Sequence, residues 1–335
     1  MSMDAIISDW KKGKFKPLYL LEGEESYYID KIVTYAETKI LTESEASFNL
    51  TIFYGKDANW VDIVNSCKRY PMFAERQVVI LKEAQHMLFS NLEMLLPYIE
   101  KPLNSTIFII SHKEKKLDGR SKMAKSIKQK GEILTTKKLY ENQMAEFGSS
   151  IVRHLGLSIT PKALALLVDH IGNDLSRMEN ELEKLAINLN GRQQVTEDDI
   201  ENYIGISKEF NVFELQGALA QRNFSKAIRI ITYFEANPKA NPIQMTLPAL
   251  YNYFSKVFMI FSVMNSDNTT IAQTLEVSPY FVKDYMAAAK QYGQQSIEKV
   301  LLLLQHYNLK SVGINNSYTN EGELMKELVT KMMFC

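Results

Sequence analysis

Short apolar runs alternate with helical patterns along the first third of the chain, and this alternation restricts the fold more than any other feature. The runs are LYLLEG (18–23), NLTIFYG (49–55), QVVIL (77–81) and STIFIIS (105–111). Each run is short and rich in aliphatic or β-branched residues, as buried strands are. Amphipathic segments lie between them, the first starting near Ser26 as its expected N-cap. Strands that alternate with helices favour a parallel sheet covered by helices on both faces.

From about Leu139 the strand signals fade and helical spacing takes over. Thr160 and Pro161 predict the start of one helix, and Gly172 predicts its end. We therefore expect an α/β domain followed by two all-α domains. The expected boundaries are 1–138, 139–207 and 208–335.

A strand, a glycine and a helix at LYLLEGEESYYIDKIV stand where a phosphate-binding loop would stand. Such a loop needs G-x-x-x-x-G-K-[ST], so that backbone amides, an ammonium and a hydroxyl hold the phosphates and magnesium. Here Gly23 is followed by Glu24 and Glu25, which repel phosphate. At the end of the third strand, Lys82 and Glu83 replace the Asp-Glu pair that an ATPase would use for magnesium. We expect no nucleotide and no other cofactor at this degenerate site.

Residues for metal binding or nucleophilic catalysis show no usable spacing. The histidines are scattered and none is paired with cysteine or carboxylate in a metal-binding pattern. No G-x-S-x-G or comparable nucleophile setting occurs. The sequence predicts no metal site and no catalytic centre in this chain.

One basic stretch interrupts an otherwise neutral chain, in which 39 basic residues balance 39 acidic residues. It runs from Lys113 to Lys130 and holds eight cations against Glu114 and Asp118. Two interpretations stay open: a solvated helix face, or a patch that meets DNA phosphates or an acidic partner. The candidate contacts are Lys113, Lys115, Lys116, Arg120, Lys122 and Lys125.

The cysteines, the N-terminus and the lengths of the apolar runs indicate the compartment in which the protein resides. Cys67 and Cys335 form no disulfide framework, which favours a reducing compartment. The N-terminus has no signal-peptide core, and no run reaches the eighteen apolar residues of a membrane span. We expect a soluble, cytoplasmic protein without a membrane partner.

The stretch YPMFAERQVVIL (70–81) places large apolar residues where a connection is expected. Pro71 ends the preceding helical pattern, so Tyr70, Met72 and Phe73 fall before the third strand. These side chains either project as anchors for a partner, or Phe73 folds back under the sheet as core. Pro71 favours the first interpretation because it holds the segment extended.

Taken in order and spacing, LYLLEGEESYYIDKI, YPMFAERQVVIL, STIFIIS and GNDLSRMENELEKLAI resemble the delta subunits of bacterial DNA polymerase III, part of the clamp loader. The resemblance covers essentially the whole chain. It implies an AAA+-like sheet that has lost its nucleotide site, then a helical lid domain and a helical collar domain that assembles with other subunits. It also implies a role in DNA replication, as a non-catalytic subunit of a DNA-directed DNA polymerase (nucleotidyltransferase) holoenzyme.

The resemblance implies partners and a partner-binding element as well. In this family, apolar side chains after a helix insert into a pocket on the ring-shaped sliding clamp; the matching positions are Tyr70, Pro71, Met72 and Phe73. Family members often carry Leu where this chain has Met72. Other expected partners are the ATPase subunits and delta-prime of the loader, with primed DNA inside the assembly. ATP would then act in the partner subunits, while clamp opening would draw on binding energy at this surface.

Three other functions are considered. An active AAA+ hydrolase would need an unusual phosphate loop. A delta-prime subunit would carry a Ser-Arg-Cys triplet, but Cys67 is preceded by Ser66. A DNA-binding scaffold without clamp contact would depend on the basic stretch, and its affinity would fall steeply with salt.

Overall fold

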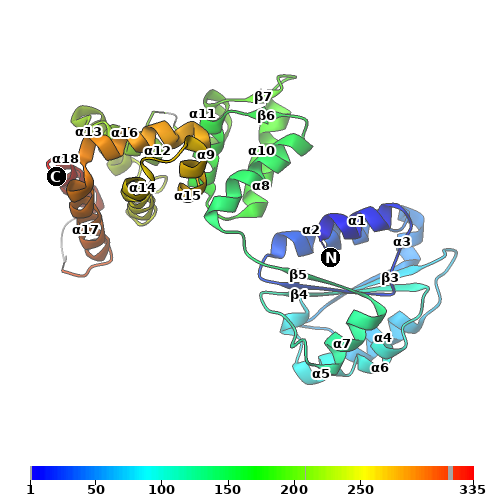
Figure 1. Ribbon diagram of the computed structural model, residues 1–335. Coiled ribbons are helices and arrows are strands. Elements are labelled where there is room, and N and C mark those ends of the chain that lie inside the picture. Colours follow the sequence, from blue (N-terminus) through cyan, green and yellow to red (C-terminus); the bar gives the residue numbers. More distant parts are fainter. Residues whose placement is uncertain (1, 208, 316–319) are drawn as a thin grey trace. The chain divides into compact units, whose positions relative to one another are not determined.

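The computed structural model describes residues 2–207, 209–315 and 320–335. It divides into two compact units, Met1–Leu139 and Tyr140–Cys335. The first is a layered α/β unit and the second is helical (Figure 1). The fold class predicted from the alternation of apolar runs is therefore confirmed.

Five parallel strands form the sheet of the α/β unit, in the order β2-β3-β4-β1-β5. Their bounds are Leu18–Gly23 (β1), Leu50–Tyr54 (β2), Gln77–Lys82 (β3), Thr106–Lys113 (β4) and Glu132–Thr136 (β5). β1, β3 and β4 are buried along almost their whole length, which is why they appear in the sequence as continuous apolar runs. Because the strands are parallel, their carboxyl ends meet at one edge of the sheet.

Helices cover both faces of this sheet (Figure 1). One face carries α1 (Met3–Lys11), α2 (Ser26–Lys39) and α3 (Glu43–Asn49), and the other carries α4 (Trp60–Lys68), α5 (Phe89–Glu93), α6 (Leu96–Glu100) and α7 (Lys122–Lys130). A single-turn 3₁₀ helix, η1, spans Ala84–His86. Alternate residues of each strand point to opposite faces of the sheet. In β1, Tyr19 and Leu21 pack in the core under α1 and α2, whereas Leu18 and Leu20 pack in the core on the other face.

The structure adds elements that the sequence patterns do not predict: α1, α3 and β5. α3 buries only Asn49 and has no apolar stripe, so periodicity cannot reveal it. β5 is an edge strand with a mixed pattern of burial. The expected N-cap at Ser26 is wrong: Glu25 caps α2, because its carboxylate accepts a hydrogen bond from the Tyr27 backbone N–H.

The second unit begins with α8 (Glu141–His154), α9 (Pro161–Ile171), α10 (Leu175–Asn188) and α11 (Glu197–Ile204). Two short strands, β6 (Ser158–Ile159) and β7 (Gln194–Val195), pair in parallel between them. α9 starts and ends as predicted, with Thr160 accepting from the Ala163 N–H and Gly172 at φ 69° after the last turn.

The helices that follow are α12 (Val212–Ala220), α13 (Phe224–Ala236), α14 (Ile243–Val263), α15 (Asn268–Leu275), α16 (Val282–Tyr292), α17 (Gln294–Ser311) and α18 (Glu321–Met333), with a 3₁₀ turn η2 at Pro279–Phe281. They share one apolar core that includes the buried rings of Phe254 and Tyr307. This separate core supports a boundary near residue 208, which we retain as a proposal. In the described residues, no helix has both the length and the apolar character to cross a bilayer.

Candidate functional site

The loop between α4 and β3, residues 69–76, carries three exposed apolar side chains. The exposed fractions are 79% for Tyr70, 54% for Met72 and 94% for Phe73. Pro71 between them is half-buried. Phe73 therefore does not pack under the sheet, and the interpretation of this residue as core is wrong.

The buried side chain of Asn49, at the end of α3, holds the middle of this loop. Its Oδ1 accepts from the Met72 backbone N–H at 2.7 Å, and its Nδ2 donates to Met72 O at 2.8 Å. Nδ2 also donates to Glu45 O at 3.0 Å. Asn49 is only 2% exposed, so these bonds form away from water. The carboxamide thus pairs with both backbone groups of Met72.

Gln77, the first residue of β3, ties the two ends of the loop together. Its Nε2 donates to Arg69 O at 2.6 Å and to Ser66 O at 3.0 Å, which satisfies carbonyls at the end of α4. The same group approaches Thr106 Oγ1 at 2.8 Å, and that hydroxyl donates to Cys67 O. Gln77 is 2% exposed, so the loop starts and ends on one buried polar network.

Phe73 adopts a left-handed backbone conformation with φ 55°. A bulky L-residue in this region is strained, by roughly 1–2 kcal/mol. Such strain persists only where neighbouring contacts impose the conformation, and it concentrates at binding and catalytic sites. The Asn49 contacts lie on the preceding residue, Met72, and the Phe73 ring itself lies in solvent.

At the end of β1, the position of a phosphate loop is filled by the chain's own groups. Gly23 has φ 125°, and a Cβ on it would lie 2.2 Å from Thr136 O, so only glycine fits. The Glu24 N–H donates to Thr136 O, and the Glu25 N–H donates to Thr136 Oγ1 at 3.2 Å. The Glu25 carboxylate also occupies the positive N-terminus of α2, a kind of position at which anions are favoured.

The end of β3 carries a cation that is paired within the chain. Lys82 Nζ forms an ion pair with Glu37 Oε1 at 2.5 Å. The next residue, Glu83, has φ 54°, and its N–H donates to Ser111 Oγ at 3.1 Å. The five residues predicted as a degenerate nucleotide site thus lie at the carboxyl ends of β1 and β3, where their backbone and side chains bond to other groups of the same unit.

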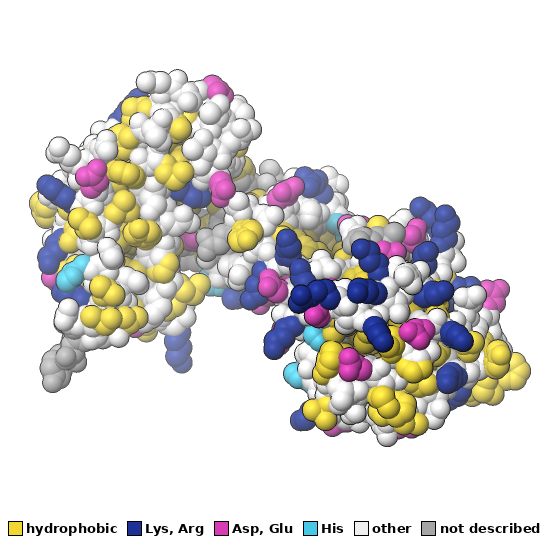
Figure 2. Space-filling model, turned by 60° about the horizontal axis from the view of Figure 1, so that its bottom comes forward, with side chains coloured by type: hydrophobic (Ala, Val, Ile, Leu, Met, Phe, Trp, Pro, Cys, Tyr) yellow, Lys and Arg dark blue, Asp and Glu magenta, His cyan; other side chains and the backbone are white. Residues whose placement is uncertain are grey.

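The basic stretch begins at the end of β4 and continues through a loop into α7. Lys113 is paired with Asp30 at 2.6 Å, and Arg120 with Asp118 on the surface. Lys115, Lys116, Lys122 and Lys125 are exposed. In the part of the chain that the structure describes, these four form no ion pair. Figure 2 shows Lys and Arg side chains gathered on the visible face of the α/β unit.

Two buried residues, Glu22 and His112, bond the loop that carries Lys115 and Lys116. Glu22 Oε2 accepts from the Leu117 N–H at 2.8 Å, and its Oε1 accepts from Thr135 Oγ1 at 3.1 Å. Its register partner on β4, His112, donates from Nδ1 to Lys115 O at 2.9 Å. Hydrogen bonds to Glu22 on β1 and His112 on β4 therefore fix the backbone of the basic loop at Leu117 and Lys115.

Neither metal binding nor thiol chemistry finds support in the described residues. They contain no cluster of three or more His, Cys, Asp or Glu side chains able to hold a metal ion. Cys67 is buried under β3 and β4, and burial raises the pKa of its thiol, which makes it unreactive.

Sequence reasoning found the apolar loop residues but missed the groups that position them. Asn49 and Gln77 are single polar residues beside apolar runs, and only their three-dimensional neighbours show what they do. Phe48, 61% exposed on α3, is a further exposed apolar side chain that the sequence analysis did not single out. A large apolar residue in the otherwise polar segment ESEASFN was the available signal.

Two family models match the chain. The model described as "DNA polymerase III, delta subunit" matches residues 19–137, and "DNA polymerase III delta subunit, C-terminal domain" matches residues 209–326. Among curated proteins, the DNA polymerase III subunit delta of Bacillus subtilis (strain 168) is 24% identical over 313 residues, covering 90% of each chain. The probable DNA polymerase III subunit delta of Aquifex aeolicus (strain VF5) is 20% identical over 321 residues, covering 90% of this chain and 89% of the relative.

A solved structure shares the fold. The Bacillus subtilis DNA clamp loader delta protein (YqeN) matches with a TM-score of 0.55 at 21% identity. The match covers 99% of this chain and 100% of that one. At this identity the likeness shows the fold alone.

Proposed function

Because the chain belongs to the DNA polymerase III delta subunit family, we propose that it binds a sliding clamp through Tyr70, Pro71, Met72 and Phe73. The observation that carries this proposal is the exposure of Phe73, 94%, on a loop whose backbone is fixed by buried side chains. An exposed, rigidly presented aromatic side chain is what a partner pocket can accept with little ordering cost.

The energy available at this surface suits a compact contact. Burying one Phe or Met side chain contributes roughly 1.5–3 kcal/mol. Phe73 and Met72 together can therefore form a small hot spot, with Tyr70 at its rim. Met72 has an unbranched side chain that adapts to the shape of a pocket.

Clamp opening then requires no nucleotide hydrolysis by this chain. If the loop binds the opened interface of the ring more tightly than the closed one, binding shifts the ring towards the open state by that difference. ATP acts in other subunits of the loader, which hide or expose this surface. The internally bonded sheet edge around Glu25 and Lys82 supports a subunit without ATPase activity over a nucleotide-hydrolysing one.

The proposal is tested by surface plasmon resonance, with the sliding clamp of the same organism immobilised and the full chain in solution. The variant Met72→Ala/Phe73→Ala should lose binding at least a hundredfold, since two anchors of roughly 1.5–3 kcal/mol each are removed. Its circular dichroism and melting temperature should stay close to those of the wild type, because both side chains lie in solvent.

The matched control is Leu88→Ala/Phe89→Ala, another exposed pair on the α/β unit, with exposed fractions of 71% and 58%. It removes similar apolar surface elsewhere and should leave clamp binding unchanged. A Met72→Ala/Phe73→Ala variant that binds as tightly as the wild type would overturn the proposal.

We also propose that the basic stretch contacts phosphates of primed DNA within the assembled loader. Its support is the exposure of Lys115 and Lys116 on a loop bonded to Glu22, and of Lys122 and Lys125 on the helix α7 that follows. Replacing these four lysines by Gln should weaken DNA binding by the assembly uniformly across sequences and reduce the slope of log K against log salt. An unchanged slope would mean that these lysines face solvent and make no contact with DNA phosphates.

The proposed setting is the clamp loader, with ATPase subunits and a delta-prime subunit as partners. The helical core of α12–α18 would form the collar and residues 139–207 the lid. A subunit of the replicative polymerase acts where the chromosome is, so we place this chain in the cytoplasm.

A further inference from the structure

We propose that Asn49 is the positioning residue of the clamp-binding loop: its carboxamide selects the backbone conformation in which Phe73 projects. This inference rests on the proposed function of the loop. Asn49 does not itself face the partner, since it is 2% exposed and bonded inward to Met72 and Glu45.

The argument from geometry concerns three successive residues. Pro71 has its φ fixed by its ring. Met72 has both its N–H and its C=O bonded to one Asn49 side chain, at 2.7 and 2.8 Å. Phe73 then takes φ 55°, a region that an aromatic residue avoids when it is unconstrained. The two bonds to Met72 are thus the contacts that can set the strained residue that follows.

The chemistry of the side chain fits this task closely. A carboxamide offers one acceptor and one donor side by side, which can bond the N–H and the C=O of a single residue, as the Asn49 side chain does with Met72. Aspartate lacks the donor, and leucine, of similar size, lacks both groups. Asn49 can therefore be replaced without a large change of volume while its hydrogen bonds are removed stepwise.

Losing the Asn49 contacts lowers the fraction of molecules that present Phe73. The apparent dissociation constant for the clamp rises in inverse proportion to that fraction. A presenting fraction of about one in ten weakens binding about tenfold, or about 1.4 kcal/mol. Since the contacts inside the complex are unchanged, the loss should fall on the association rate, whereas Phe73→Ala should increase the dissociation rate.

The experiment compares full-length wild type, Asn49→Asp and Asn49→Leu. Hydrogen exchange in the free chain follows the Met72 amide, and surface plasmon resonance against the clamp gives both rate constants. We expect faster Met72 exchange and about tenfold slower association in Asn49→Leu. Asn49→Asp retains the acceptor but places an oxygen where Nδ2 faces Met72 O and Glu45 O, so it should also show faster Met72 exchange and slower association than the wild type.

The matched control is Asn211→Leu in the helical unit. Asn211 is also buried, at 6% exposure, and also joins two backbone groups, with Nδ2 donating to Ser207 O and Oδ1 accepting from the Glu214 N–H. It should lose comparable stability while leaving clamp association unchanged. A general destabilisation would instead slow association in both variants.

The outcomes separate this inference from the proposed function. If Phe73→Ala abolishes binding but Asn49→Leu associates like the wild type, or if its Met72 amide exchanges no faster, the role of Asn49 is overturned and clamp binding stands. A wild-type chain that does not bind the clamp overturns both. Should Asn49→Leu fail to fold, Asn49→Asp decides by the same two readouts.

Discussion

Lys82 Nζ lies 2.5 Å from Glu37 Oε1 at the carboxyl end of β3, with both side chains largely shielded from solvent. The same ammonium lies 5.7 Å from the centre of the Tyr54 ring. An ATPase of similar topology would need a carboxylate for magnesium at this point. In this chain the position holds a cation that is already neutralised by its own neighbour.

The first prediction concerns nucleotides. Isothermal titration of the isolated chain with ATP and magnesium should give no binding heat, because Glu25 occupies the N-terminus of α2 and Lys82 opposes the metal. Stoichiometric, tight binding would restore the hydrolase interpretation.

The second prediction concerns the strain at Phe73. Glycine adopts φ 55° without a Cβ penalty, whereas alanine does not. In urea unfolding, Phe73→Gly should therefore be more stable than Phe73→Ala by about 1 kcal/mol. Both variants should bind the clamp poorly. An alanine variant as stable as the glycine variant would mean that residue 73 is not held left-handed in solution.

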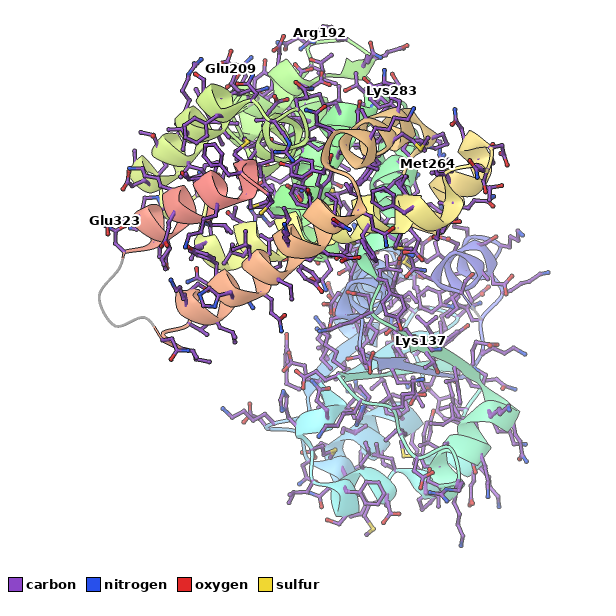
Figure 3. The ribbon with its side chains drawn as sticks, turned by 60° about the vertical axis from the view of Figure 1, so that its left-hand side comes forward. Lys137, Arg192, Glu209, Met264, Lys283 and Glu323 are labelled. Atoms are coloured by element: carbon purple, nitrogen blue, oxygen red, sulfur yellow. The ribbon has the colours of Figure 1, made fainter. Side chains whose placement is uncertain are left out.

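The third prediction concerns pH and the α11 cap. Burial of Asp199 opposes its ionisation, but hydrogen bonds from Arg192, at 2.5 Å, and from Thr196 outweigh this and hold the pKa of Asp199 below its ordinary value. Arg192 is labelled in Figure 3. A lowered pKa in the folded state stabilises the protein above the unfolded-state pKa, and this stabilisation is lost as pH falls through the folded-state pKa.

We therefore expect Asp199→Asn to reduce the free energy of unfolding at pH 7, and the difference from wild type to shrink as the pH approaches 3. Urea unfolding across this range measures it. Glu183→Gln, which removes an exposed carboxylate from α10, serves as the control and should show a small difference at every pH. A constant gap for Asp199→Asn would contradict the assignment.

The sequence predicted the parts of this protein that follow from apolar patterning. Buried strands such as β3 and β4 are continuous apolar runs, and Thr160 with Pro161 marks the start of α9 because caps act locally. Patterning could not reveal α3, which packs through Asn49 and not through an apolar stripe.

The same distinction applies to the candidate site. Tyr70, Met72 and Phe73 stood out because large apolar residues are unusual in a connection. Asn49, 23 positions before Met72, could not be assigned to them, since the contact depends on how α3 and the loop meet in space. The basic stretch was visible as charge, but its attachment to Glu22 was not, because that contact joins residues 95 positions apart.

The central claim, that a clamp covers the 70–73 loop, is tested most directly by oxidative footprinting of two half-exposed methionines of the α/β unit, Met72 and Met94, 54% and 49% exposed. Both should oxidise at similar rates in the free chain. Saturating sliding clamp should protect Met72 at least several-fold and leave Met94 unchanged. Equal oxidation of Met72 with and without clamp, under conditions where mass spectrometry shows the complex, would contradict the account.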